Sequence, residues 1–301
     1  MMAGVSGIYD EPELYQLACA YRDVPAESGA LLTWLDTHAT SAGGVRSVIE
    51  LAAGPAEHAR ELAHRGLHAT ALDHTAAMCA YAAAQAKADD VDLDVVEADM
   101  RDFRLTDAAG APARFDLAIT MLNSVCHLFT LDDLVDHLTA VAAHLKPGGL
   151  YIVELAHPAD FLAAEPRTSS DWTIDAGGVH AQVRWGGRED RIDPLTQVTD
   201  EHMMIKVTAA DGTVRTVSDV VPNRFWTLTE FTAAVRLANA TAANASAATA
   251  ATAASAASAA SAGAVAARPL ELVASYGDFD VETTLDAPNA WRMILVLRSA
   301  D

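Results

Sequence analysis

Short apolar stretches alternate with helix-like segments through the first half of the chain. Five segments have the pattern of buried strands: residues 45–50, 67–73, 93–99, 115–122 and 150–155. One helix-like segment between them begins at Pro55 and stops at Gly66, and another begins after Thr130, a residue suited to an N-cap, and ends before Pro147. Strands joined by helices predict right-handed crossovers and a doubly wound parallel α/β sheet.

The pattern changes after Pro158. Apolar and polar residues alternate over four segments: residues 172–174, 179–185, 197–209 and 213–221. Turn signals such as Gly177–Gly178 and Asp211–Gly212 separate them, as in hairpins. We therefore expect an antiparallel β insert after the fifth strand.

The last part of the chain holds one segment of low complexity. Residues 237–267 carry no charge, and 19 of these 31 residues are alanine. Alanine adds little transfer energy, and the interspersed Ser, Thr and Asn oppose insertion, so we expect a solvated insertion without a packing face rather than a membrane span. A capping box at Thr227–Glu230 precedes it, and strand-like segments at 270–277 and 291–298 follow.

The charge and the cysteine content of the chain exclude several classes of partner and site. The 301 residues include 41 acidic and 20 basic side chains, a net charge of −21. This charge repels phosphate backbones, so we expect no nucleic-acid partner. Cys19, Cys79 and Cys126 lie far apart in the sequence, which indicates neither a disulfide framework nor a zinc knuckle. Without a leader-like N-terminus or an apolar stretch of about eighteen residues, the chain is expected to be cytoplasmic, with no membrane partner.

Acidic and small residues follow the predicted strands where a doubly wound sheet binds its ligands. Glu50 ends the first strand and leads into a loop of small residues around Gly54. Asp73 ends the second strand, at the place where a carboxylate can take both hydroxyls of a ribose. After the third strand, Asp99 can accept from an exocyclic amine, and Met100 can flank an aromatic ring.

With these residues in place, the chain resembles the class I S-adenosylmethionine-dependent methyltransferases, in the small-molecule branch that is methyltransferase domain 25-like. The resemblance covers residues 9–157 well and includes the MLNSVCHL and KPGGLYIVEL stretches. It implies S-adenosyl-L-methionine as cofactor and S-adenosyl-L-homocysteine as product. The cofactor-binding residues that it implies, together with Tyr15 and Asn123 near the site, are Glu50, Ala52, Gly54, Asp73, Asp99 and Met100.

One departure from the family pattern concerns the loop after the first strand. The usual glycines are replaced by Ala52 and Ala56, which leaves only Gly54 of three. If either alanine position requires a positive φ, the loop must differ from that of the family. The same loop argues against a nicotinamide dinucleotide, because Glu57 stands where its pyrophosphate would approach.

Residues that could serve the methyl acceptor follow the fourth and fifth strands. His127 can act as a base or orient the acceptor, and Asn123 is expected to bind rather than to act as a base. Glu154 and His157 are candidates for acceptor binding, as is Tyr9 in the N-terminal segment. Each also has a structural alternative: packing for the rings, and a strand-end role for the glutamate. No metal ligand set is expected.

The resemblance also implies how the chain is divided into domains. It implies an N-terminal helical lid over residues 1–40 and a cofactor-binding core over 41–157. The β insert, residues 158–226, would roof the acceptor pocket or form a homodimer, and 227–301 would return to the core. We expect methyl transfer to a small molecule, with an amine slightly preferred because an acidic protein attracts a cation. O-methylation, a non-catalytic cofactor-binding protein and an NAD(P)-dependent oxidoreductase remain alternatives.

Overall fold

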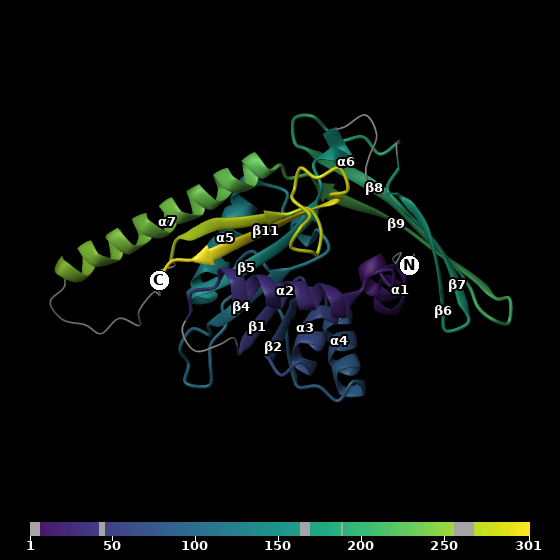
Figure 1. Cartoon of the computed structure of the whole chain (residues 1–301), viewed down its shortest axis with the longest axis horizontal. Helices are drawn as coiled ribbons and strands as arrows, with labels where there is room; N and C mark the ends of the chain where they lie inside the picture. The colour runs from purple at the N-terminus through teal and green to yellow at the C-terminus, as the bar shows by residue number, and fades with distance from the viewer. Residues whose placement is uncertain (1–6, 42–45, 163–168, 188, 256–267) are drawn as a thin grey trace, which may run out of the picture.

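A computed structural model describes residues 7–41, 46–162, 169–187, 189–255 and 268–301. The large sheet has seven strands in the order β10-β11-β5-β4-β1-β2-β3 (Figure 1). Their bounds are β1 (Ser47–Leu51), β2 (His68–Asp73), β3 (Leu93–Glu97), β4 (Phe115–Thr120), β5 (Leu145–Ala156), β10 (Leu270–Tyr276) and β11 (Arg292–Ser299). Strands β1 to β5 are parallel, and β11 is antiparallel to β5 and β10. The predicted doubly wound sheet is confirmed.

Helices cover both faces of this sheet. On one face, α2 (Val24–His38), α3 (Glu57–His64) and α4 (Ala76–Ala88) pack on side chains such as Ile152 and Leu117. On the other face, α5 (Leu131–His144) and α7 (Leu228–Ser255) pack on Tyr151 and Val153. Successive residues of β5 thus point to opposite layers, as the pleat of a strand requires. Thr130 caps α5, as predicted, by accepting from the Asp133 N–H at 3.0 Å.

The predicted antiparallel insert is also present. It is a four-stranded sheet of β6 (Asp171–Ala176), β7 (Val179–Trp185), β8 (Val198–Thr208) and β9 (Val214–Arg224), in that order. Figure 1 shows it arching away from the large sheet, with α1 (Pro12–Ala18) between the two. Ile8 of η1 (Ile8–Asp10) and Leu14 of α1 pack against Met203 and Ile205 of β8. The N-terminal segment, residues 7–22, therefore packs with one side against the insert.

The expectation that the alanine-rich tract lacks a packing face is wrong for its first residues. The helix that starts at the Thr227–Glu230 capping box continues through the tract to Ser255. Ala238 and Ala242, one helical turn apart, are buried. Asn239 exchanges two hydrogen bonds with the backbone of Leu270, at 2.8 and 2.9 Å. Small side chains at this spacing let the helix lie close to the core; residues 256–267 lie outside the described residues.

A buried network of ions ties the N-terminal segment to the core. The Arg22 guanidinium lies 2.6 Å from Glu27 and 2.8 Å from Glu154 at the end of β5. Arg292 of β11 lies 3.2 Å from both carboxylates, and His58 of α3 lies 2.8 Å from Glu27. Every member is buried, so each charge depends on the others for compensation.

The proton affinities in this network follow from its pairing. Burial alone would raise the pKa of Glu27, but the hydrogen bond from His58 and the charge of Arg22 lower it to about 2. Burial opposes a charged imidazole, yet the hydrogen bonds to Glu27 and Glu50 raise the pKa of His58 to about 9. His58 is therefore a cation at neutral pH, and it joins α3 to α2 as the third positive charge of the network.

The loop from β1 to α3 holds two alanines in the left-handed region. The φ angles of Ala52, Gly54 and Ala56 are 50°, 51° and 56°. The sequence left open whether these two alanines have a positive φ, and both of them do. A left-handed alanine is strained by roughly 1–2 kcal/mol.

The first prediction concerns His58. Its folded pKa of about 9 exceeds the ordinary value of 6.5, so its stabilisation is complete below pH 6.5 and is lost as the pH rises through 9. We expect a fall of roughly 3 kcal/mol in the free energy of unfolding across that window. Urea denaturation of His58→Gln should lack this fall, whereas His64→Gln, exposed on the same helix, should retain it. An identical pH profile for His58→Gln and wild type would contradict the assignment.

The second prediction concerns the strained loop. Ala52→Gly and Ala56→Gly should each stabilise the fold by about 0.5–1 kcal/mol, because relief of strain exceeds the added chain entropy. Ala53→Gly is the matched control, since Ala53 has no positive φ and should be destabilised by the same change. Chemical denaturation of the three variants measures this; destabilisation by all three would show that the loop is not strained.

Candidate functional site

A cavity lies at the carboxyl ends of β1 and β4. It is lined by Tyr15 and Arg22 of the N-terminal segment, by residues of the 50–58 loop and by residues 121, 122 and 124. A Cβ on Gly54 would lie 3.7 Å from the Tyr15 ring and 3.9 Å from the Met78 sulfur, so the loop passes close to both. The cavity therefore combines the small-residue loop with a wall from the N-terminal segment.

Asp73 lies beside this loop at the end of β2. One of its carboxylate oxygens accepts from the Gly54 N–H at 2.8 Å, and the other accepts from the Thr75 N–H at 2.8 Å. Each oxygen retains a lone pair for a further donor. Asp73 thus fixes the loop and can still receive the hydroxyls of a ribose.

Asp99 and Met100 follow β3. Arg101 donates to both carboxylate oxygens of Asp99, and these hydrogen bonds lower the pKa of Asp99. Met100 is buried in the core cluster with Phe103, and its carbonyl lies 2.8 Å from His137 Nδ1. The Asp99 carboxylate is an ion here, oriented by Arg101, and Met100 supplies apolar surface next to it.

Glu50, the acidic residue of the predicted first motif, is buried and has local partners. Its Oε2 accepts from the Ala59 N–H at 2.8 Å, in the first turn of α3. Its Oε1 lies 3.5 Å from His58 Nδ1. A carboxylate at this place stabilises the N-terminus of α3 and so fixes the end of the loop that contains Ala52 and Gly54.

Tyr9 and His127 meet although 118 positions separate them. The Tyr9 hydroxyl lies 3.0 Å from His127 Nε2, and the two rings are edge to face. The His127 ring also hydrogen-bonds the backbone of Pro222. Proline has no N–H, so the imidazole is the donor there, and its Nε2 is left to accept from Tyr9. Burial, with the charge of His74, lowers the pKa of His127, which keeps the ring neutral.

Asn123 has a positive φ of 58° and holds the turn between β4 and η2 (Ser124–His127). Its Oδ1 accepts from the Ala156 N–H at 3.1 Å, and its own N–H donates to the Glu154 carbonyl at 3.1 Å. The side-chain oxygen therefore ties the turn that carries His127 to β5.

Glu154 and His157 have partners of other kinds. The Glu154 carboxylate accepts from Arg22 and from the Leu122 N–H at 2.9 Å, within the ion network. His157 Nε2 lies 2.9 Å from the Leu285 carbonyl, and its Nδ1 accepts from the Ala159 N–H. The structure thus gives both residues positioning contacts at the end of β5.

Sequence reasoning does not single out two residues that line the cavity, Arg22 and His58. Arg22 also pairs with Glu154, 132 positions away, and His58 pairs with Glu27, 31 positions away, so no local spacing reveals their place in the site. The sequence does hold a signal for Arg292, because it directly precedes the apolar run of residues 293–297, where an unpaired buried charge would be costly.

Within 7–41, 46–162, 169–187, 189–255 and 268–301, no group of three or more His, Cys, Asp or Glu side chains could hold a metal ion. In the same part of the chain, no helix has both the length and the apolar character needed to cross a membrane.

Comparison with known proteins identifies the domain. Residues 48–149 match the family model of the methyltransferase domain. The cypemycin N-terminal methyltransferase of a Streptomyces species is 26% identical over 195 residues, which span 64% of this chain and 69% of that protein. The residues that match the family model include Glu50, Gly54, Asp73 and His127.

Solved structures agree in fold. Streptomyces venezuelae DesVI superposes with a TM-score of 0.70 at 18% identity, over 96% of this chain and 98% of that one. An S-adenosylmethionine-dependent methyltransferase from Clostridium acetobutylicum gives 0.68 at 12% identity, over 95% and 96%. The cofactor of this family is S-adenosylmethionine. Residues 48–149 thus carry a methyltransferase domain, and the comparisons support a class I S-adenosylmethionine-dependent methyltransferase of the small-molecule type.

Proposed function

We propose that this enzyme methylates the nitrogen of a small-molecule amine. The observation that carries the proposal is the neutral imidazole of His127, whose Nε2 lone pair lies at the Tyr9 hydroxyl close to the cofactor cavity. An amine acceptor must be deprotonated when it attacks, and the Tyr9 hydroxyl can take that proton while it passes its own to the neutral imidazole. The relative from Streptomyces is named for methylation of an N-terminus, which is also an amine.

The residues at the carboxyl ends of the strands hold the cofactor in this proposal. Gly54 passes the methionine part, Asp73 accepts from the ribose hydroxyls, and Asp99 with Met100 receives the adenine. Bound there, S-adenosylmethionine supplies a methyl group on a positively charged sulfur. Tyr15, against Gly54, closes the cavity and excludes water as part of an N-terminal lid.

The remaining residues of the site position these groups. Asn123 orients the turn that carries His127, and Glu154 holds Arg22 at the cavity wall. Tyr9 orients the His127 ring and forms one wall for the acceptor. His157 fixes the chain after β5 by its contact with Leu285.

We also place the reaction in the cytoplasm. Cys19, Cys79 and Cys126 are free thiols, which suits a reducing compartment.

The third prediction tests cofactor binding. Asp73→Ala should weaken the binding of S-adenosylhomocysteine by about 1–3 kcal/mol, roughly 5-fold to 150-fold, because the ribose hydroxyls lose their acceptor. Calorimetric titration measures this, with Asp94→Ala on the neighbouring strand as an exposed control. An unchanged affinity for Asp73→Ala would show that Asp73 serves the loop alone.

The fourth prediction tests the reaction. With S-adenosylmethionine present, an amino sugar should yield S-adenosylhomocysteine and an N-methylated product by mass spectrometry, whereas the parent sugar, with a hydroxyl in place of the amine, should not. Product from the parent sugar alone would establish O-methylation instead. Titration with NAD and NADP is the control for cofactor choice, and no binding is expected.

A further inference from the structure

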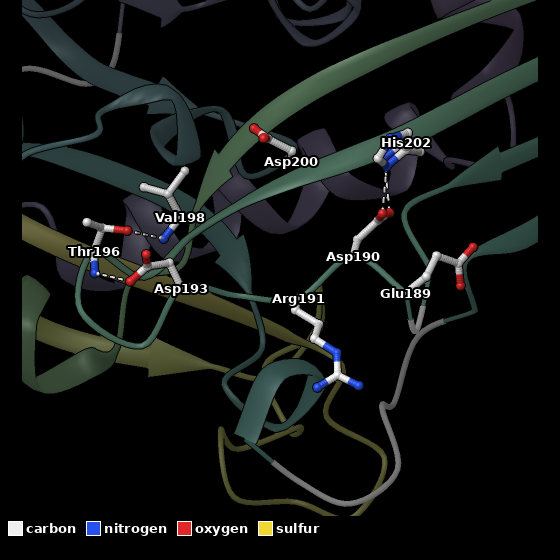
Figure 2. Close-up of a pocket in the computed structure, with 8 residues that line it drawn as sticks. All are labelled: Glu189, Asp190, Arg191, Asp193, Thr196, Val198, Asp200 and His202. Carbon is white, nitrogen blue, oxygen red and sulfur yellow. Dashed lines mark hydrogen bonds and ion pairs between the residues drawn. The ribbon is translucent and has the colours of Figure 1, made fainter.

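Glu201 lies on the face of β8 that is turned toward the N-terminal segment. It shares this face with Met203 and Ile205, which are buried two and four positions further along the strand. Its neighbours Asp200 and His202 line a hollow on the other side of the strand (Figure 2). In that hollow His202 is paired with Asp190, at 2.7 Å. Glu201 is therefore separated from the acidic surface of the insert.

The hydrogen-bond partners of Glu201 are neutral. Asn223 of β9 donates to its carboxylate at 2.5 Å, and the Trp185 indole donates as well. Among the residues that the structure describes, no Arg, Lys or His forms an ion pair with Glu201. The buried carboxylates of Glu27 and Glu154, by contrast, are each paired with arginine. Glu201 is thus a partly buried anion that lacks a counter-charge from the part of the chain that the structure describes.

The electrostatic consequence is visible in its protonation. Burial raises the pKa of Glu201 to about 6, against the hydrogen bond from Asn223 and with the charge of Asp190 adding to the rise. The group remains ionised at neutral pH but is close to losing its charge. A cation bound beside it would restore the balance, because opposite charges attract strongly where water is scarce.

The ring that contacts Glu201 belongs to a series of aromatic rings. Trp185, which hydrogen-bonds Glu201, lies edge to face with Tyr15 at 6.2 Å between ring centroids. Tyr15 is 5.6 Å from Tyr9, and Tyr9 is 5.5 Å from His127. The faces of tryptophan and tyrosine attract cations, and a carboxylate among them increases that attraction.

Glu201 is also tied to the element that carries His127. Asn223, its donor, accepts from the Cys126 thiol at 2.9 Å, and Cys126 immediately precedes His127 in η2. The charge of Glu201 is close enough to Tyr9 to add to burial in raising the pKa of that phenol. The carboxylate, the Tyr9 hydroxyl and the His127 ring therefore belong to one cluster beside the cofactor cavity.

We propose that Glu201, with the rings of Tyr9, Tyr15 and Trp185, forms the binding site for the ammonium group of the methyl acceptor. This inference rests on the proposed N-methylation and names the residue that recognises its substrate class. The carboxylate supplies the counter-charge that holds the ammonium, and the proton that the nitrogen must lose before methylation passes to the Tyr9 and His127 pair. A neutral or anionic acceptor would gain nothing from it.

The test uses full-length protein saturated with S-adenosylhomocysteine and two probes of the same shape, benzylamine and benzyl alcohol. Binding is measured by ligand-observed NMR for wild type, Glu201→Gln and Asp200→Asn. The last variant removes one negative charge from the adjacent, outward-facing position and leaves the cluster intact. Thermal melting checks folding, and Glu201→Asp provides a second variant that keeps the charge.

We expect benzylamine to bind wild type and Asp200→Asn equally, and Glu201→Gln at least tenfold more weakly. Glu201→Asp should retain part of the affinity, and the alcohol should bind no more tightly to wild type than to Glu201→Gln. Equal benzylamine affinity in Glu201→Gln and wild type, or no benzylamine binding by wild type, would overturn the proposal. Failure to bind S-adenosylhomocysteine would instead overturn the cofactor site, so the two failures are distinguishable.

Discussion

The ion network around Glu27 is the interaction on which the arrangement of the site depends. One carboxylate receives Arg22, Arg292 and His58, and these come from the N-terminal segment, the last strand and the helix after the cofactor loop. A buried charge left without its partner is strongly destabilising, so these three elements hold one another in place. Apolar contacts of Ile8 and Leu14 and hydrogen bonds such as those of Gln16 with Glu57 and of Trp172 with the Ala18 carbonyl add to this anchoring.

The position of that segment determines what the enzyme can bind. It brings Tyr15 against the Gly54 loop on one side and Tyr9 against His127 on the other. The cavity for the cofactor and the aromatic cluster around Glu201 are consequently neighbours that share a wall. Methyl transfer requires that two ligands are aligned and shielded from water. One anchored segment that contacts both sites can meet both requirements.

The parts of the fold that local pattern specifies were predictable. Apolar runs and capping residues such as Thr130 set the parallel sheet, and alternation set the insert. The network was not predictable, because Glu27 and Arg292 are 265 positions apart and each is an ordinary charge in its own segment. The burial of Ala238 was not predictable for a different reason. An alanine-rich helix has no amphipathic pattern, so which of its faces packs depends on the neighbouring elements. Glu201 looks like one exposed position of an alternating strand, and its surroundings come only from tertiary structure.

The central claim is that Glu27 holds the N-terminal segment over the site. Hydrogen exchange of Glu27→Gln tests it most directly, because amide protection reports the opening of each element separately. We expect amides of α1 to exchange faster in this variant than in wild type, with those of β4 and β5 unchanged. Unchanged protection of α1, or faster exchange of all elements alike, would contradict the claim and show that the network stabilises the fold without anchoring the segment.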